Sequence, residues 1–141
     1  MGAHMSRFET VQATLQAEIA KPYAYGSADC FFTGLAMIDA IRGTSHVETY
    51  AGRYKTLAGA QKALRADGHK SLVSFMEALL GIRIAPLHAS IGDIGVIALP
   101  VEGKKRLAEH VGIHDGRQWW VKTEDGVRKF DSAQATAAYR T

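Results

Sequence analysis

The chain has 141 residues, of which 47% are hydrophobic and 22% are charged. This length supports one domain with a real core, and the composition is that of an ordinary globular protein. A net charge of +3 with scattered basic residues gives no support for a nucleic-acid partner, and one cysteine excludes an internal disulfide.

Residues 1–4 have the pattern of an expression-tag remnant, and Met5 is the expected native start. No apolar run approaches the length of a membrane span, and no signal peptide is visible. We therefore expect residues 5–141 to form a single domain without a membrane partner.

The first half of the chain is predicted to be helical. Ser6 and Glu9 form a capping-box pattern, and the apolar residues that follow recur at helical spacing. The first helix must end before Pro22, because a proline disfavours helical conformation in the residue that precedes it. The predicted helices cover residues 6–20, 30–42, 56–66 and 72–80, with a loop at 23–29 and an irregular segment at 44–55.

The second half is predicted to form strands. Alternating apolar residues are separated by Asp-Gly pairs at 115–116 and 125–126, which are typical of tight turns between antiparallel strands. Helices followed by an antiparallel meander indicate an α+β fold. The predicted strands cover residues 82–85, 92–99, 108–114, 118–123 and 127–130, and one helical turn is expected from 132.

The only cysteine, Cys30, lies where the 23–29 loop becomes a helix. Ser27 or Asp29 can cap this helix by accepting hydrogen bonds from its first amides. A thiol in the first turn lies at the positive end of the helix dipole, which lowers its pKa and favours a nucleophilic thiolate. The alternative is a small buried hydrophobic residue that happens to be cysteine.

A cysteine nucleophile needs a base, and two of the six histidines lie together on the predicted strand 108–114. Alternation places His110, Gly112 and His114 on one face of that strand. Gly112 indicates the close approach of another group, which we expect to be the cysteine helix. A metal site formed by the two histidines is disfavoured, because strand positions four apart are too distant to share one ion.

These residues resemble one known family. Tyr23-Ala24-Tyr25-Gly26 with Asp29-Cys30, then Gly92-Asp93-Ile94-Gly95-Val96, then His110-Val111-Gly112-Ile113 are similar to three ordered blocks of the NlpC-type papain-like cysteine peptidases. The resemblance covers residues 22–123. Gly52-Arg53-Tyr54 and the compact size are similar to a small phage or prophage branch of that family, associated with tail proteins.

The resemblance implies a papain-like fold in which the nucleophile helix packs on the antiparallel meander. It implies that Cys30 is the nucleophile and that His110 is its general base and then its acid. Tyr23 matches the family tyrosine that supports the oxyanion, to which the Cys30 backbone amide can also donate. Asp29 supports the site as a helix cap rather than a catalytic acid, since a carboxylate beside the thiolate raises the thiol pKa.

The chain departs from the family at the residue that orients the histidine, which is a His, Asn or Gln on the next strand. A three-residue turn over 115–117 pairs His110 with Lys122, whose ammonium cannot accept a hydrogen bond from the imidazole. Thr123, a main-chain carbonyl, or Gln118 in a different register are the alternatives.

The resemblance implies a cysteine peptidase or amidase that hydrolyses peptide bonds of bacterial cell-wall peptidoglycan without a metal or cofactor. Its expected location is the bacterial cytoplasm or the tail of a phage particle, with tail proteins as candidate partners. The alternative, which Lys122 supports, is a catalytically inactive papain-like module with a structural or wall-binding role in tail assembly. Acyl transfer by the same two residues would differ only in the acceptor.

Overall fold

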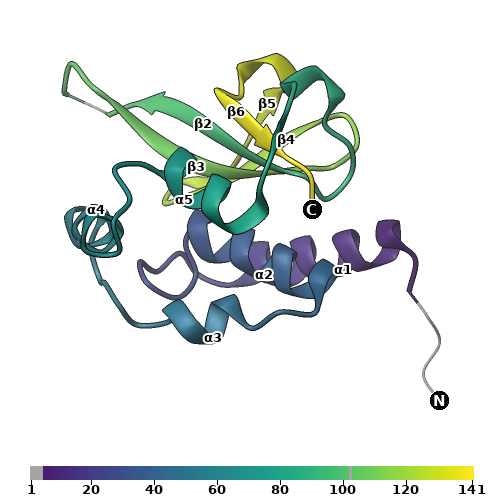
Figure 1. Ribbon diagram of the computed structural model, residues 1–141, viewed down its shortest axis with the longest axis horizontal. Coiled ribbons are helices and arrows are strands. Elements are labelled where there is room, and N and C mark those ends of the chain that lie inside the picture. Colours follow the sequence, from purple (N-terminus) through teal and green to yellow (C-terminus); the bar gives the residue numbers. More distant parts are fainter. Residues whose placement is uncertain (1–4, 102) are drawn as a thin grey trace.

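The computed structural model describes residues 5–101 and 103–141, so the predicted tag remnant at 1–4 lies outside the described residues. In Figure 1 the strands form one layer, and α1, α2 and α3 lie along one side of it. The predicted α+β class is confirmed. The helices are α1 (Arg7–Ala20), α2 (Cys30–Arg42), α3 (His46–Tyr50), α4 (Leu57–Ala66) and α5 (Leu72–Leu80).

The sheet is antiparallel, and its strand order is β1-β6-β2-β3-β4-β5. Strands β2 to β5 form the predicted meander, whereas β6 inserts between β1 and β2. Two 3-10 turns, η1 and η2, connect the strands. The bounds are β1 (Arg83–Ile84), η1 (Pro86–His88), β2 (Ile94–Pro100), β3 (Leu107–His114), β4 (Gln118–Thr123), β5 (Gly126–Asp131), η2 (Ser132–Gln134) and β6 (Ala137–Tyr139).

Two elements differ from the sequence prediction. The segment predicted to be irregular contains α3, whose first amides at His46 and Val47 donate to the Asp39 carboxylate at 2.8 and 2.9 Å. The tail contains β6 in addition to the predicted helical turn, and β6 pairs with β1 through Ala138 and Tyr139 and with β2 through all three of its residues. Both elements are stabilised by partners outside their own segment, the Asp39 side chain for α3 and two strands distant in sequence for β6.

Helix α2 packs directly on β3. A Cβ atom added to Gly34 would lie 2.5 Å from Val111 Cγ1, so a larger residue at this position would clash with the strand. The expectation that Gly112 faces the cysteine helix is wrong. A Cβ at Gly112 would meet Ile97 Cδ1 at 2.6 Å and Val121 Cγ2 at 3.4 Å, on the other face of the sheet.

That second face is also buried, because the sheet curls around Trp119. The indole ring of Trp119 is fully buried, covers Gly95, and donates from Nε1 to the carbonyl of Ser132 in η2. His114 lies here too, 2% exposed, with Nε2 2.8 Å from Ser132 Oγ and Nδ1 accepting from the Gly116 amide. Because Nδ1 accepts, Nε2 carries the proton, so His114 cannot act as a base toward Ser132.

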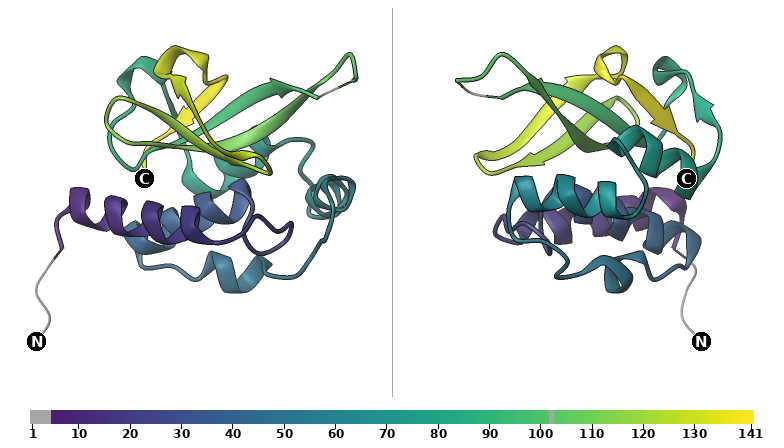
Figure 2. Two further views of the ribbon diagram at one scale, coloured as in Figure 1. Left: turned by 180° about the vertical axis from the view of Figure 1, so that it is seen from behind. Right: turned by 60° about the vertical axis from the view of Figure 1, so that its left-hand side comes forward.

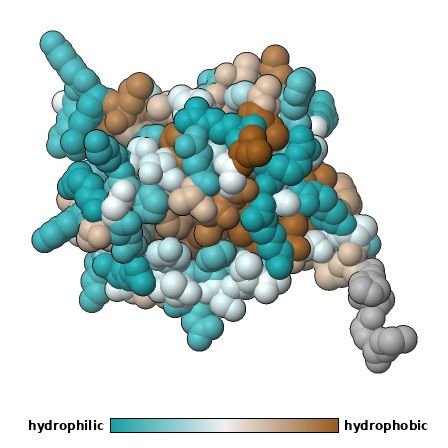
Figure 3. All heavy atoms as spheres, viewed as in Figure 1, coloured by the Kyte–Doolittle hydropathy of each residue, from teal (hydrophilic) through white to brown (hydrophobic). Residues whose placement is uncertain are grey.

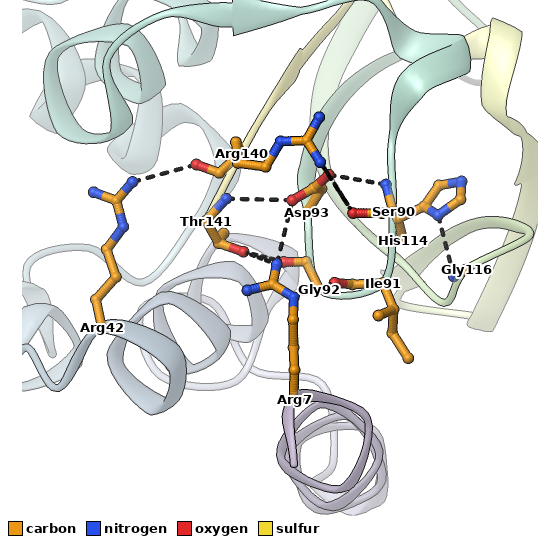
Figure 4. Close-up of polar contacts among 10 residues, drawn as sticks. All are labelled: Arg7, Arg42, Ser90, Ile91, Gly92, Asp93, His114, Gly116, Arg140 and Thr141. Atoms are coloured by element: carbon orange, nitrogen blue, oxygen red, sulfur yellow. Dashed lines mark hydrogen bonds and ion pairs between the residues drawn. The ribbon is translucent and has the colours of Figure 1, made fainter.

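A buried carboxylate joins the start of β2 to both ends of the described chain. Asp93 is fully buried, and its oxygens lie 3.3 Å from Arg7 Nη2 and 3.6 Å from Arg140 Nη1 (Figure 4). The amides of Ser90 and Thr141 also donate to it. Asp93 in the Gly92-Asp93 block therefore has a structural position, held between α1 and the segment after β6.

Helix α4 lies at the edge of this body, with the half-buried Leu64 packed against the core. It has no buried residue, and Figure 1 and the left-hand view of Figure 2 place it at one end of the molecule, joined by extended connections. The space-filling view shows hydrophobic side chains among hydrophilic ones on the face seen in Figure 1 (Figure 3). Among the described residues, no helix is both long and apolar enough to cross a membrane.

Candidate active site

Cys30 is the first residue of α2 and is 8% exposed. Asp29 caps the helix as expected, with its Oδ1 accepting from the Phe32 amide at 3.0 Å. The other oxygen, Oδ2, accepts from the Gly26 amide at 3.2 Å and from the Tyr54 hydroxyl at 2.6 Å. Both oxygens are thus occupied by structural donors, which fits the predicted role of a cap.

The loop before Cys30 is fixed by the segment that follows α3. Gly26 has a φ of +86°, and a Cβ atom there would lie 1.9 Å from the Tyr54 carbonyl oxygen. The Gly26 carbonyl accepts from the Gly52 amide at 2.9 Å. The Gly52-Arg53-Tyr54 segment therefore positions the loop, and through Asp29 it positions the first turn of α2.

His110 lies opposite Cys30, with its Nδ1 3.9 Å from Sγ. The two residues are 80 positions apart in sequence, and α2 and β3 bring them together as the sequence predicted. The Val111 amide also donates to Sγ at 3.5 Å. This amide points at the sulfur because the recorded pairing of β3 with β4 covers Ile113 and His114 and does not extend to Val111.

The resting state of this pair is a thiol and a neutral imidazole. Burial raises the pKa of Cys30 to about 12, opposed by the Val111 amide and reinforced by the Asp29 carboxylate. Burial, with the nearby charge of Arg128, lowers the pKa of His110 below its ordinary value of 6.5. The expectation that the helix dipole lowers the thiol pKa is therefore wrong for the free protein, because desolvation outweighs it.

The predicted pairing of His110 with Lys122 is wrong. His114 pairs with Trp119, and the Asp115 amide donates to the Gln118 carbonyl at 3.0 Å, so the turn holds two residues, Gly116 and Arg117, and the register shifts by one. Lys122 instead turns to the opposite side, where its Nζ donates to the Glu18 carbonyl of α1 at 2.7 Å. Its ammonium is held by α1 and does not stand beside the imidazole.

The other two candidates for the third position have different partners. The Thr123 hydroxyl donates to the Gly126 carbonyl at 2.6 Å, within the β4–β5 turn. Gln118 lies at the β3–β4 turn, where its backbone amide donates to the Asp115 side chain. Among the described residues, the recorded hydrogen-bond partner of the His110 ring is Cys30.

Tyr23 lies in the same cleft as Cys30 and His110. Its ring packs edge-on against Tyr25 at 5.3 Å between centroids. Burial, followed by the negative charge of a Cys30 thiolate, raises the pKa of Tyr23 well above its usual range. The phenol therefore stays protonated and can donate a hydrogen bond toward a developing oxyanion.

Two hollows meet at His110. The first, here called the α4 cleft, has a volume of about 320 Å³ and lies between α4 and the body of the protein, with Cys30 in its lining. The second, here called the hairpin pocket, has a volume of about 290 Å³ and is lined by residues of the β4–β5 hairpin. Tyr23, Tyr25 and His110 line both hollows.

Three site features were not found from the sequence. Tyr54 was noted only as part of a short motif, although its hydroxyl bonds the capping carboxylate. Glu109, next to His110, accepts from the first amide of α5 at 2.9 Å and ties β3 to that helix. The Tyr25 hydroxyl donates to Glu124 across the hairpin pocket. The only available signal was that Tyr54 and Glu109 lie in or beside conspicuous motifs.

No metal site is present among the described residues: they contain no group of three His, Cys, Asp or Glu side chains that could hold an ion. His110 and His114 point into different surroundings, the first toward Cys30 and the second toward Ser132. Cys30 and His110 could therefore serve as a nucleophile and a base.

A family model described as "Domain of unknown function (DUF6950)" matches residues 6–141. The comparisons with curated proteins and with solved structures give no match. The arrangement of Cys30, His110 and Tyr23 is therefore the basis for assigning chemistry to this chain.

Proposed function

The chain belongs to the DUF6950 family, and we propose that it is a papain-like cysteine peptidase or amidase of the NlpC type. The observation that carries the proposal is the position of Cys30 Sγ, at the N-terminus of α2, facing an open cleft and 3.9 Å from His110 Nδ1. The packing of the nucleophile helix on an antiparallel sheet supports the finer fold assignment.

The reaction begins when the Cys30 sulfur attacks the carbonyl carbon of a peptide bond. Because the resting thiol is protonated, His110 Nδ1 takes the thiol proton as the carbon–sulfur bond forms. The tetrahedral intermediate collapses, the carbon–nitrogen bond breaks, and His110 gives the proton to the leaving amine. Water then attacks the thioester, with His110 again accepting a proton, and the acid is released with the thiol restored.

The oxyanion of both tetrahedral intermediates needs donors near Cys30. The amides of Cys30 and Phe31, the first two of α2, have no intrahelical acceptor, whereas the Phe32 amide is taken by Asp29. The Tyr23 phenol supplies a further donor that stays protonated across the working pH range. Preorganised donors of this kind are worth about 3–4 kcal/mol of transition-state stabilisation.

The substrate assignment rests on the resemblance of the three sequence blocks to NlpC-type enzymes. We propose the peptides of bacterial cell-wall peptidoglycan as substrate and a phage or prophage tail as the setting. The experiment is digestion of purified peptidoglycan by wild-type protein, Cys30→Ala and His110→Ala, with released peptides measured by mass spectrometry. His88→Ala, at an exposed histidine outside both hollows, is the matched control.

Wild type and His88→Ala should release the same peptides, and both site variants should lose this release by two orders of magnitude or more. Equal release by Cys30→Ala would contradict the proposal. The inactive-module alternative is favoured by one observation, the burial of Cys30, which disfavours the thiolate. It predicts that wild type and Cys30→Ala bind cell-wall sacculi equally and that neither releases peptides.

A further inference from the structure

The loop that carries Tyr23 is fixed mainly by contacts that come after that residue. The Gly26 carbonyl accepts from the Gly52 amide, and Asp29 caps α2, so both restraints act on the second half of the loop. No backbone hydrogen bond of Tyr23 itself is recorded among the described residues. The direction of the Tyr23 ring must therefore be set by contacts between side chains.

One side-chain contact joins this loop to the β4–β5 hairpin. The Tyr25 hydroxyl donates to Glu124 Oε1 at 2.5 Å, across 99 positions of sequence. Burial, together with this hydrogen bond, raises the pKa of Tyr25 to about 12, so the phenol keeps its proton and stays a donor. Hydrogen bonds to a carboxylate are shorter and stronger than those between neutral groups. We call this contact the hairpin anchor.

The hairpin pocket contains two other charged residues besides Glu124, namely Asp125 and Arg128. The Arg128 guanidinium lies over the Phe130 ring, 5.0 Å from its centroid. Among the described residues, the recorded hydrogen-bond partner of the Tyr25 hydroxyl is Glu124. The anchor is therefore made by one particular carboxylate and not by the charge of the hairpin as a whole.

Tyr25 transmits this restraint to Tyr23. The two rings meet edge to face, with centroids 5.3 Å apart and ring planes at 86° to each other. The positive edge of one aromatic ring is attracted to the negative face of another, so this arrangement has a preferred angle as well as a preferred distance. A Tyr25 ring that is fixed by Glu124 therefore limits the rotation of the Tyr23 ring.

The tyrosine pair lies where the two hollows meet. Tyr23 and Tyr25 line both of them, beside His110. Glu124 lines only the hairpin pocket, and Cys30 lines only the α4 cleft. Glu124 thus shares no hollow with the sulfur, and its effect on the reacting atoms must pass through the two tyrosines.

We propose that Glu124 and Tyr25 are positioning residues, which hold the Tyr23 phenol toward the oxyanion that forms during attack by the thiol. This inference rests on the proposed peptidase function. The oxyanion exists only in the tetrahedral intermediates and the transition states that flank them. Loss of the hairpin anchor therefore lowers kcat and leaves KM nearly unchanged.

The test measures kcat and KM for hydrolysis of soluble muropeptides. Glu124→Ala and Tyr25→Phe should each lower kcat about tenfold and change KM by less than about twofold. Glu124→Gln keeps an acceptor oxygen and should restore kcat to within about threefold of wild type. Glu77→Ala, which removes an exposed glutamate outside both hollows, is the matched control and should behave as wild type.

A double-mutant cycle with Tyr23→Phe separates positioning from general damage to the site. In the Tyr23→Phe background, Glu124→Ala should change kcat by less than about twofold, because the donor that it positions is absent. An equal tenfold loss in both backgrounds would overturn the proposal while the peptidase stands. An unchanged kcat in Glu124→Ala would overturn it in the same way.

Nuclear magnetic resonance tests the hairpin anchor without activity. Cross-peaks between the Tyr23 and Tyr25 rings should be present in wild type, Glu124→Gln and Glu77→Ala, and they should be lost in Glu124→Ala. If the cross-peaks depend on Glu124 but wild type hydrolyses no muropeptide, the anchor stands and the peptidase is contradicted. Cross-peaks that persist in Glu124→Ala would overturn the anchor, whatever the activity.

Discussion

At the scale of single residues, the chemistry of the site depends on how burial sets two pKa values in opposite directions. The thiol of Cys30 is held protonated and the imidazole of His110 is held neutral. The site therefore resembles a general-base system, in which the proton leaves the sulfur during attack, rather than a preformed ion pair.

The first prediction concerns pH. Because the folded-state pKa of His110 lies below 6.5, kcat/KM should persist as pH falls below 6.5 and be lost only as pH passes through that lowered value. Alkylation of Cys30 by iodoacetamide should rise steadily above pH 9 without a plateau near neutrality, since the thiol pKa is about 12. The measurements are a kcat/KM profile and alkylation rates against pH.

His110→Ala should leave the alkylation profile unchanged, because a neutral imidazole does not stabilise the thiolate. A plateau at neutral pH that disappears in His110→Ala would mean that the resting pair is a thiolate and an imidazolium. The general-base mechanism would then be wrong.

The second prediction concerns Tyr54, whose hydroxyl donates to Asp29 Oδ2 at 2.6 Å. Tyr54→Phe removes a hydrogen bond to a buried carboxylate and should lower the free energy of unfolding by about 1.5–3 kcal/mol. Denaturant titration measures the change. Tyr50→Phe, a neighbouring tyrosine whose hydroxyl has no recorded partner among the described residues, is the control and should change it by less than about 0.5 kcal/mol.

The residue scale also shows where sequence reasoning reached its limit. The juxtaposition of Cys30 and His110 was predicted, but from family resemblance, since their 80-residue separation carries no local signal. Lys122 was misplaced because an Asp-Gly turn accommodates two or three residues, and one residue of difference turns every following side chain to the other face. Only the tertiary contact of Lys122 with Glu18 distinguishes the two-residue turn from the three-residue turn.

At the scale of elements, the site depends on the distance between α2 and β3. Gly34 permits that distance, because a Cβ there would lie 2.5 Å from the stiff side chain of Val111. The same strand carries the Val111 amide and the His110 ring that contact Sγ. A change in this packing should therefore move both groups relative to the sulfur.

The third prediction is that Gly34→Ala lowers the free energy of unfolding by about 1–3 kcal/mol through overpacking, although alanine is the better helix former. Denaturant titration and kcat/KM should both decline. The double variant Gly34→Ala, Val111→Ala should be less destabilised than the sum of the two single variants, since the added methyl then has room. Strict additivity would show that the two residues do not contact.

Elements with a strong local pattern were predicted well, whereas two short elements held by partners outside their own segment were not. α1, α2, α4 and α5 and the β2–β5 meander follow from capping residues and apolar spacing. α3 is five residues long and is capped by Asp39 from the preceding helix. β6 contains three residues that become a strand because β1 and β2 leave a gap between them.

At the scale of the whole molecule, Asp93 joins α1, β2 and the last residues into one unit. Arg7 and Arg140 reach its buried carboxylate from opposite ends of the sequence, and two backbone amides and the Ser90 hydroxyl also donate to it. In the structure, Asp93 of the Gly92-Asp93 block stabilises the fold by holding these segments together. The sequence motif indicated only that a strand begins there.

The fourth prediction is that Asp93→Ala lowers the free energy of unfolding by about 2–4 kcal/mol, because it leaves buried amides and two arginines without their acceptor. Glu77→Ala, which removes a surface carboxylate paired with Arg83, is the matched control and should cost less than about 1 kcal/mol. Thermal unfolding of both variants gives the comparison. Equal losses would mean that the Asp93 cluster does not hold the ends together.

The peripheral position of α4 has a consequence for how the protein exchanges hydrogen with solvent. A helix without a buried residue can open locally at little free-energy cost, while α2 opens only with the whole domain. Amide protons of α4 should therefore exchange with deuterium orders of magnitude faster than those of α2. An occupant of the α4 cleft would contact both α4 and the body of the protein and should slow exchange in α4 selectively. The helix that forms one wall of the cleft would then be ordered fully only when the cleft is filled.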